Sequence, residues 1–190
     1  PDEKSILFTG TLAARSLKTG GNFYLYQRSS GEFRQLTNSP ETQVNVKFSP
    51  DSKKIGFVRS GDIVTIDLAT GKEERLTADA SEHVFNGHFD WVYEEEFGII
   101  DGWVWSPDNR SIAFWQLDER RVPEFPIVDF LPLHQEMKTM RYPKAGDPNA
   151  IVRIGVVDLP GGQGETNGAA RPVRWLDIGA PADSSQDLYI

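Results

Sequence analysis

The part of this chain best suited to chemistry is an acidic and aromatic run, Asp90-Trp91-Val92-Tyr93-Glu94-Glu95-Glu96-Phe97. Three consecutive carboxylates repel one another, and repulsion between like charges at close range tends to raise the pKa of one of them. A positively charged partner would relieve that repulsion. The run therefore favours the binding of a cationic group.

The local conformation decides which carboxylates could act together. In a strand, Glu94 and Glu96 would share one face and Glu95 would point away. In a helical turn, neighbouring side chains are about 100° apart, so adjacent carboxylates can converge on one small cation. Asp90 is a good N-cap and acids are favoured in a first turn, so we predict a short helix over residues 90–97, anchored by its aromatic side chains. Acids in a first turn can equally be dipole complements on a solvated face, and the spacing leaves that alternative open.

The elements that would hold this helix form an internal repeat. Ser49-Pro50-Asp51 and the strand-like residues that follow it recur as Ser106-Pro107-Asp108 and its own strand-like continuation. Pro presets φ and Asp tolerates tight geometry, so each copy is expected to be a turn that feeds a strand. A second pattern of strand, glycine turn and strand occurs at residues 23–37 and again at residues 63–77.

This order of elements predicts an all-β fold. We expect a β-propeller of four-stranded antiparallel blades, with about three blades in residues 1–190 and a short helical insert near 90–97. A β-sandwich also has short strands and regular turns, but the repeat favours the propeller. Residues 82–101 are expected to lie between blades, and residues 118–149 to form an extended arm inserted in a blade.

Two motifs resemble a known family. The acidic run and the following Trp103-Val104-Trp105-Ser106-Pro107 are similar to the signature of the dipeptidyl peptidase IV group, within the prolyl oligopeptidase family of serine peptidases. Arg141-Tyr142-Pro143-Lys144-Ala145-Gly146 resembles a second motif of that family. The resemblance implies that residues 1–190 are a partial N-terminal propeller, and that a C-terminal α/β-hydrolase domain is absent from this chain.

The resemblance also implies which side chains bind substrate. By their position in the motif, Glu95 and Glu96 would bind the N-terminal ammonium of a peptide substrate, with Glu94 in a structural role. An Arg that holds a substrate carbonyl in the family would correspond to Arg15. The α-amino group of a peptide has a pKa near 8 and is largely cationic at neutral pH, and two carboxylates would give it charge-assisted hydrogen bonds.

No catalytic residue is expected in this chain, because its 190 residues contain no Gly-x-Ser-x-Gly nucleophile elbow. In the family, Ser, Asp and His come from the hydrolase domain. The resemblance therefore implies that the full-length protein is a serine-type dipeptidyl peptidase that removes Xaa-Pro or Xaa-Ala dipeptides. A non-catalytic propeller scaffold or binding module is the main alternative. A carbohydrate-active propeller is weaker, since adjacent carboxylates do not flank a bond from opposite sides.

The composition excludes several classes of binding partner and cofactor. A net charge of -8 argues against a nucleic-acid partner, and the absence of Cys excludes thiolate catalysis and Cys-ligated zinc. The spacing of His83 and His88 suits no common zinc motif, so no metal and no other cofactor is expected. Apolar residues within 118–141 favour a homodimer interface, which the resemblance also implies, over the alternative that the segment folds back onto the propeller's own surface. It further implies a periplasmic or extracellular location, free or membrane-anchored, although this chain carries no targeting signal.

Overall fold

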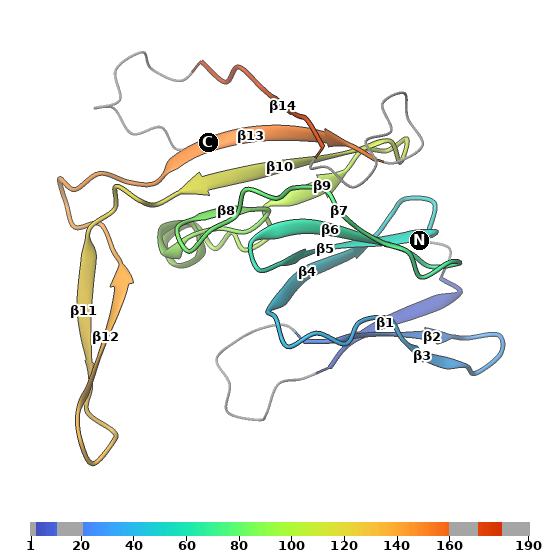
Figure 1. Cartoon of the computed structure of the whole chain (residues 1–190), viewed down its shortest axis with the longest axis horizontal. Helices are drawn as coiled ribbons and strands as arrows, with labels where there is room; N and C mark the ends of the chain where they lie inside the picture. The colour runs from blue at the N-terminus through green and yellow to red at the C-terminus, as the bar shows by residue number, and fades with distance from the viewer. Residues whose placement is uncertain (1–2, 11–20, 160–170, 180–190) are drawn as a thin grey trace.

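The computed structural model describes residues 3–10, 21–159 and 171–179, and its fold is all-β apart from one short helix (Figure 1). Within these ranges the helix is η1 (Val92–Glu96), and the strands are β1 (Ser5–Thr9), β2 (Phe23–Gln27), β3 (Phe33–Gln35), β4 (Gln43–Phe48), β5 (Lys54–Arg59), β6 (Asp62–Asp67), β7 (Glu73–Arg75), β8 (Val84–Asn86), β9 (Trp103–Trp105), β10 (Ser111–Asp118), β11 (Glu124–Asp129), β12 (Glu136–Arg141), β13 (Ile151–Asp158) and β14 (Val173–Trp175). The predicted all-β class is confirmed. No helix in the described ranges could span a membrane.

Three antiparallel sheets follow one another along the chain, as in successive propeller blades (Figure 1). The first contains β1 to β3. The second is the predicted four-stranded meander, β4-β5-β6-β7. The third has the order β14-β13-β10, with both β8 and β9 paired to β10. The third blade therefore differs from the expected pattern, because its first strand is in two pieces.

The repeated Ser-Pro-Asp turns form the same hydrogen bonds in both copies. The hydroxyl of Ser49 donates to Asp51 Oδ1, and that of Ser106 to Asp108 Oδ1, each over 2.7 Å. In each copy the backbone N–H five residues after the serine donates to the serine hydroxyl over 2.9 Å. The two turns also touch, because the N–H of Asp51 donates to Asn109 Oδ1 over 3.1 Å. Corresponding turns of adjacent blades are thus held side by side.

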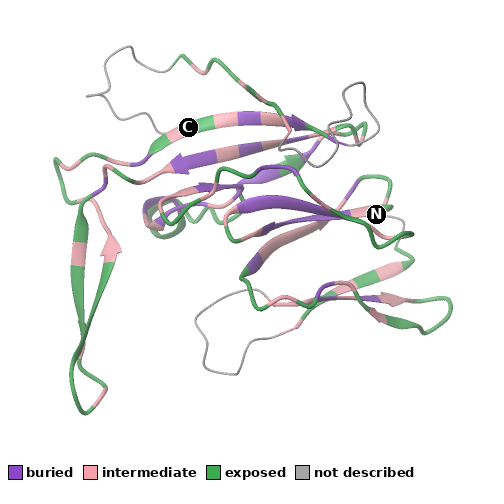
Figure 2. Ribbon diagram, viewed as in Figure 1, coloured by how far each residue is buried: buried purple, intermediate pink, exposed green. Residues whose placement is uncertain are grey.

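The core lies between neighbouring sheets, where Figure 2 shows the buried parts of the strands. Trp103, 1% exposed, and Trp105 of the third blade pack against Gly56 of β5 in the second. A Cβ at Gly56 would lie 2.7 Å from the Trp103 ring and 2.9 Å from the Trp105 ring. Glycine in the middle of this strand is therefore explained by the close approach of two aromatic rings.

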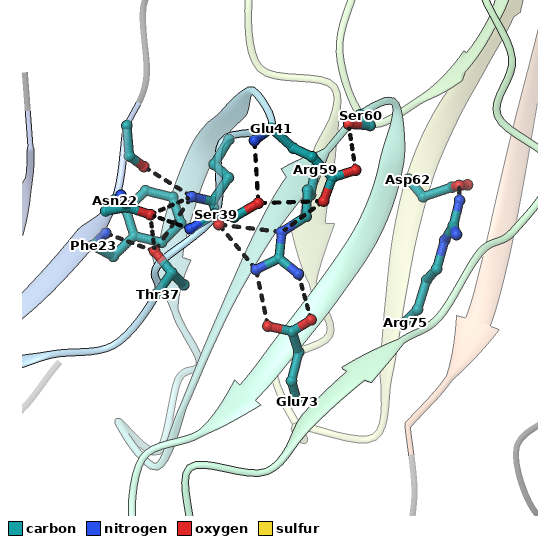
Figure 3. Close-up of polar contacts among 12 residues, drawn as sticks. Asn22, Phe23, Thr37, Ser39, Glu41, Arg59, Ser60, Asp62, Glu73 and Arg75 are labelled. Atoms are coloured by element: carbon teal, nitrogen blue, oxygen red, sulfur yellow. Dashed lines mark hydrogen bonds and ion pairs between the residues drawn. The ribbon is translucent and has the colours of Figure 1, made fainter. Parts of the chain in front are cut away.

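A buried polar network joins the first blade to the second (Figure 3). The side chain of Gln43 is fully buried, and its Nε2 donates to Asn22 Oδ1 (3.1 Å) and to Thr37 Oγ1 (3.3 Å). Its Oε1 accepts a hydrogen bond from Arg59 Nη2 (3.0 Å), and the same Arg59 forms an ion pair with Glu73. Both polar ends of the buried amide are therefore satisfied, as burial of a polar group requires.

Residues 88–101 leave the third blade from the middle of its first strand, and we call them the excursion. Asn86 of β8 pairs with Gln116 and Trp103 of β9 pairs with Phe114, so a single position of β10, Trp115, is left between them. Gly87 N donates to Trp115 O (2.9 Å), and Trp115 N donates to the carbonyl of Gly102 (2.9 Å). The expectation that residues 82–101 lie between blades is therefore wrong, since this segment interrupts a strand.

Strands β11 and β12 form a hairpin that extends away from the three sheets (Figure 1). The β10–β13 pairing continues to Asp118 and Ile151, and the hairpin is inserted between these two strands. Four apolar side chains near its tip are exposed: Phe130 (70%), Leu131 (95%), Leu133 (95%) and Met137 (71%).

Candidate functional site

The excursion carries the predicted helix, η1 (Val92–Glu96), with Trp91 and Phe97 in helical conformation on either side of it. Asp90 Oδ1 accepts a hydrogen bond from Tyr93 N (3.1 Å), and the Asp90 carbonyl accepts one from Glu94 N (3.1 Å). Through its carboxylate, Asp90 thus satisfies one free N–H group at the helix start, as an N-cap does. Burial raises the pKa of the Asp90 carboxyl, although hydrogen bonds from the backbone N–H groups of Tyr93, Asp90 and Val92 oppose the rise. Residues 92–96 are of the π type, a wider turn than that of an α-helix.

Aromatic contacts hold the helix against the fold on one side. Tyr93 is buried and stacks on Phe89, with ring centroids 4.9 Å apart. Trp91 packs edge-on against Tyr142, 4.6 Å away. Phe97 contacts Tyr93 over 5.5 Å but is 51% exposed. Two of the three expected anchors are therefore packed, and the third lies at the surface.

The three carboxylates of Glu94, Glu95 and Glu96 lie on one helical turn and are exposed. Within the described ranges, no Lys or Arg forms an ion pair with any of them. Partial burial raises the pKa of Glu94, and the nearby charges of Glu95 and Asp90 raise it further. Since a π-helix has more residues per turn than an α-helix, adjacent side chains on it diverge less. Among the residues that the structure describes, this turn therefore concentrates negative charge without an ion-pairing cation.

A pocket of about 460 Å³ lies between the excursion and the second blade. Glu94 and His88 of the excursion border it, together with Glu82, which precedes β8. Burial lowers the pKa of His88, although a hydrogen bond with the Phe89 carbonyl opposes this. The other residues that line the pocket are Thr42, Val44, Asn45, Val58, Ser60, Gly61, Ser81, Phe85 and Ile100.

The sequence-predicted site residues are placed as follows. Glu95 and Glu96 follow Glu94 in the sequence and are exposed, but they do not line the pocket. Glu94, expected to be structural, is the one that borders it. Arg15 lies outside the described residues. In the part of the chain that the structure covers, no group of three His, Asp or Glu side chains could hold a metal ion.

Sequence reasoning missed the contribution of the second blade. Asn45 and Lys47 of β4 both contact the base of the excursion. Lys47 Nζ lies 2.6 Å from Asp101 Oδ2 and 4.2 Å from the centre of the Trp103 ring. These contacts leave no local signal in the sequence, because they depend on how two blades meet.

Comparison with known proteins gives a consistent result. The whole chain, residues 1–190, matches the family described as the dipeptidyl peptidase IV (DPP IV) N-terminal region. It is 33% identical over 170 residues to dipeptidyl aminopeptidase B of Saccharomyces cerevisiae, covering 85% of this chain and 20% of that protein. It is 30% identical over 175 residues to a probable dipeptidyl-aminopeptidase B of Talaromyces marneffei.

Among solved structures, the chain resembles the crystal structure of Porphyromonas gingivalis dipeptidyl peptidase 4. The TM-score is 0.72 at 28% sequence identity, and the match covers 95% of this chain and 25% of that one. The chain thus spans 20% of the length of the curated relatives named above.

Proposed function

This chain belongs to the dipeptidyl peptidase IV N-terminal region family, and we propose that it is the substrate-recognition propeller of a serine exopeptidase that removes N-terminal dipeptides. In this proposal Glu95 and Glu96 bind the ammonium group at the substrate's N-terminus. The relatives are named as dipeptidyl peptidases and aminopeptidases, which supports a free N-terminus as the group to be recognised.

The observation that carries the proposal is the concentration of negative charge on one turn. Glu94, Glu95 and Glu96 are consecutive and exposed, and no described Lys or Arg neutralises them. Partial burial and the negative charge of Glu95 both raise the pKa of Glu94. An ammonium group brings one positive charge and three N–H donors, so it would relieve the repulsion while it forms charge-assisted hydrogen bonds.

The way the turn is held supports a role in orientation. Buried Tyr93 and the capping carboxylate of Asp90 fix the helix, and both ends of the excursion are attached to β10 through Trp115. An amine held on such a turn is fixed relative to the propeller. Binding energy remote from the bond to be cleaved is then used to orient the substrate.

The proposed chemistry needs a second component. We propose that the hydrolase domain implied by the resemblance supplies the nucleophile and its general base, and that the distance from the amine site to that nucleophile sets the two-residue product. Xaa-Pro and Xaa-Ala preference would be set in that domain. The proposal also places the protein in the periplasm or outside the cell, as the family resemblance suggests.

We further propose that the arm, residues 118–149, takes part in a homodimer. The apolar side chains of Phe130, Leu131 and Leu133 are 70 to 95% exposed at the tip of its hairpin, and exposed apolar surface of this kind commonly marks an interface.

The test of the amine site is the double variant Glu95→Gln/Glu96→Gln in the full protein that carries this chain. Gln keeps the size of Glu and removes the charge. Each charge-assisted hydrogen bond is worth about 1.5–3 kcal/mol, so kcat/KM for a chromogenic Xaa-Pro substrate with a free amine should fall by about 100-fold or more. Glu32→Gln, an exposed Glu in the β2–β3 turn, is the matched control and should leave kcat/KM unchanged.

The outcomes separate the candidate functions. Unchanged kcat/KM in the double variant would refute the amine site. No turnover by the wild-type protein, together with binding of free-amine peptides that the double variant loses, would favour the non-catalytic binding module instead. Circular dichroism and the urea midpoint of each variant show whether a loss comes from unfolding.

A further inference from the structure

Strand β4 of the second blade contains a β-bulge beside the excursion. Its pairing with β5 shifts between Val44 and Lys47, so that Asn45 and Val46 together oppose one residue of β5. Asn45 has φ 56°, in the left-handed region that Asn tolerates better than most side chains. Bulges bend a strand and re-aim a side chain, and this one turns Asn45 toward the neighbouring blade.

The side chain of Asn45 bonds both limbs of the excursion. Its Nδ2 donates to the carbonyl of Gly87 (3.2 Å), just before the excursion, and to that of Ile100 (3.0 Å), four residues after Glu96. The Asn45 carbonyl in turn accepts a hydrogen bond from Trp103 Nε1 (3.0 Å), just after the excursion. One residue of the second blade is therefore bonded to both ends of the loop that carries the acidic turn.

We infer that Asn45 is a positioning residue for the amine-binding carboxylates, an inference that rests on the proposed function. Its side-chain N–H groups bond the excursion and none of the second blade's own strands. The bulge directs this amide at the two carbonyls. The Lys47–Asp101 ion pair supports the same limb from the same strand. Asn45 thus fixes where the Glu95–Glu96 turn stands relative to the second blade.

The variants separate the amide from the backbone conformation. Asn45→Gly keeps the left-handed φ and removes the side chain. Asn45→Asp keeps the size and tolerates the same φ, but it places oxygen atoms against two carbonyl oxygens. The matched control is Asn109→Gly. Asn109 also has a positive φ (60°) and also bonds the adjacent blade, through Asp51 N (3.1 Å), but it lies in the β9–β10 turn and not at the excursion.

The measurement is the amine contribution to binding, in the full protein. It is the ratio of the inhibition constants of a des-amino dipeptide analogue and of the same dipeptide with its free amine. Two lost hydrogen bonds of ordinary strength correspond to about a tenfold change in an equilibrium constant, so Asn45→Gly should lower this ratio about tenfold and Asn45→Asp by more. Asn109→Gly should leave it unchanged, because general loss of stability affects both ligands equally.

Two further results are expected. In the Glu95→Gln/Glu96→Gln background, Asn45→Gly should have no additional effect on the ratio, since it acts through those carboxylates. Hydrogen exchange of the amides in residues 88–101 should become faster in Asn45→Gly, and this can be measured even if catalysis is lost.

The inference fails alone if Glu95→Gln/Glu96→Gln abolishes the amine contribution while Asn45→Gly and Asn45→Asp keep it within twofold of wild type. If the glutamate double variant itself leaves the ratio unchanged, the proposed function fails and the inference falls with it. An equal drop in Asn109→Gly and Asn45→Gly would also overturn it, because the effect would then not depend on the hydrogen bonds to the excursion.

Discussion

Two glycines of the loop that carries the acidic turn are required for opposite reasons, and substitution should distinguish them. Gly98 follows the helix with φ 66°, and a Cβ built on it would have no atom within 4 Å. Gly102 lies at the base of the excursion, where a Cβ would be 2.9 Å from the backbone carbon of Gly87 and 3.0 Å from His88 N. Gly98 is therefore required because of its left-handed backbone conformation, and Gly102 because a Cβ there would collide with backbone atoms.

The expected costs follow from these two causes. Alanine at Gly98 should lower the free energy of unfolding by about 1 kcal/mol, the penalty of a left-handed residue with a Cβ. Asparagine there should cost less, because Asn tolerates that conformation. Alanine at Gly102 should cost about 1–3 kcal/mol, since backbone atoms must move to admit it. Asparagine at Gly102 should cost at least as much as alanine, because it is larger.

The assay is urea unfolding of the four single variants in the full protein, followed by tryptophan fluorescence. The diagnostic result is a different order at the two positions: at position 98 the Asn variant should have a higher free energy of unfolding than the Ala variant, and at position 102 it should not. If Asn rescued position 102, or if alanine at Gly102 cost less than alanine at Gly98, the steric explanation for the base of the excursion would be wrong. Hydrogen exchange provides a second measure, because the backbone amides of residues 88–101 should exchange faster in Gly102→Ala than in wild type.

Two other outcomes are expected. Leu131→Ser/Leu133→Ser should convert a dimer of the full protein into a monomer in sedimentation velocity at unchanged fold, and a wild type that is itself monomeric would contradict the interface. Hydrogen bonds from the backbone and hydroxyl of Thr70, and from Lys54, lower the pKa of Asp67 from 3.8 to about 2. An acid whose pKa is lowered by folding stabilises the protein when the pH is above its ordinary pKa, and this stabilisation is lost as the pH falls through the folded-state pKa. The free energy of unfolding of wild type should therefore exceed that of Asp67→Asn by an amount that shrinks between about pH 4 and about pH 2. A difference that does not change with pH would contradict this.

Local signals explain what the sequence predicted well. The Ser-Pro-Asp turns at residues 49 and 106 depend on hydrogen bonds within six residues, so their identity could be predicted without knowledge of the rest of the fold. The helix at residues 90–97 was predictable for the same reason, because Asp90 caps it from within its own segment. Because these local elements recur along the chain, the sequence also predicted that they belong to whole blades.

Features that depend on distant pairing could not be predicted in this way. The strand β8 has three residues, and its relation to β9 is visible only through their shared partner β10. The bulge at Asn45 has no local signal in the sequence, because the groups that its side chain bonds lie in another blade. The place of Glu94 on the pocket likewise depends on the second blade, which lines the opposite side.

The gap in the first strand of the third blade makes the acidic loop separable from the blade that bears it. One residue is enough to fill the place opposite Trp115, so a chain that ran from Gly87 directly to Trp103 would preserve both existing registers. A loop of different length or sequence could be spliced in at this junction without shifting any strand. Strand pairing in this blade therefore does not depend on the loop, although a new loop would have to replace the contacts of Asn45 and Lys47 with its end and the core packing of Phe89 and Tyr93.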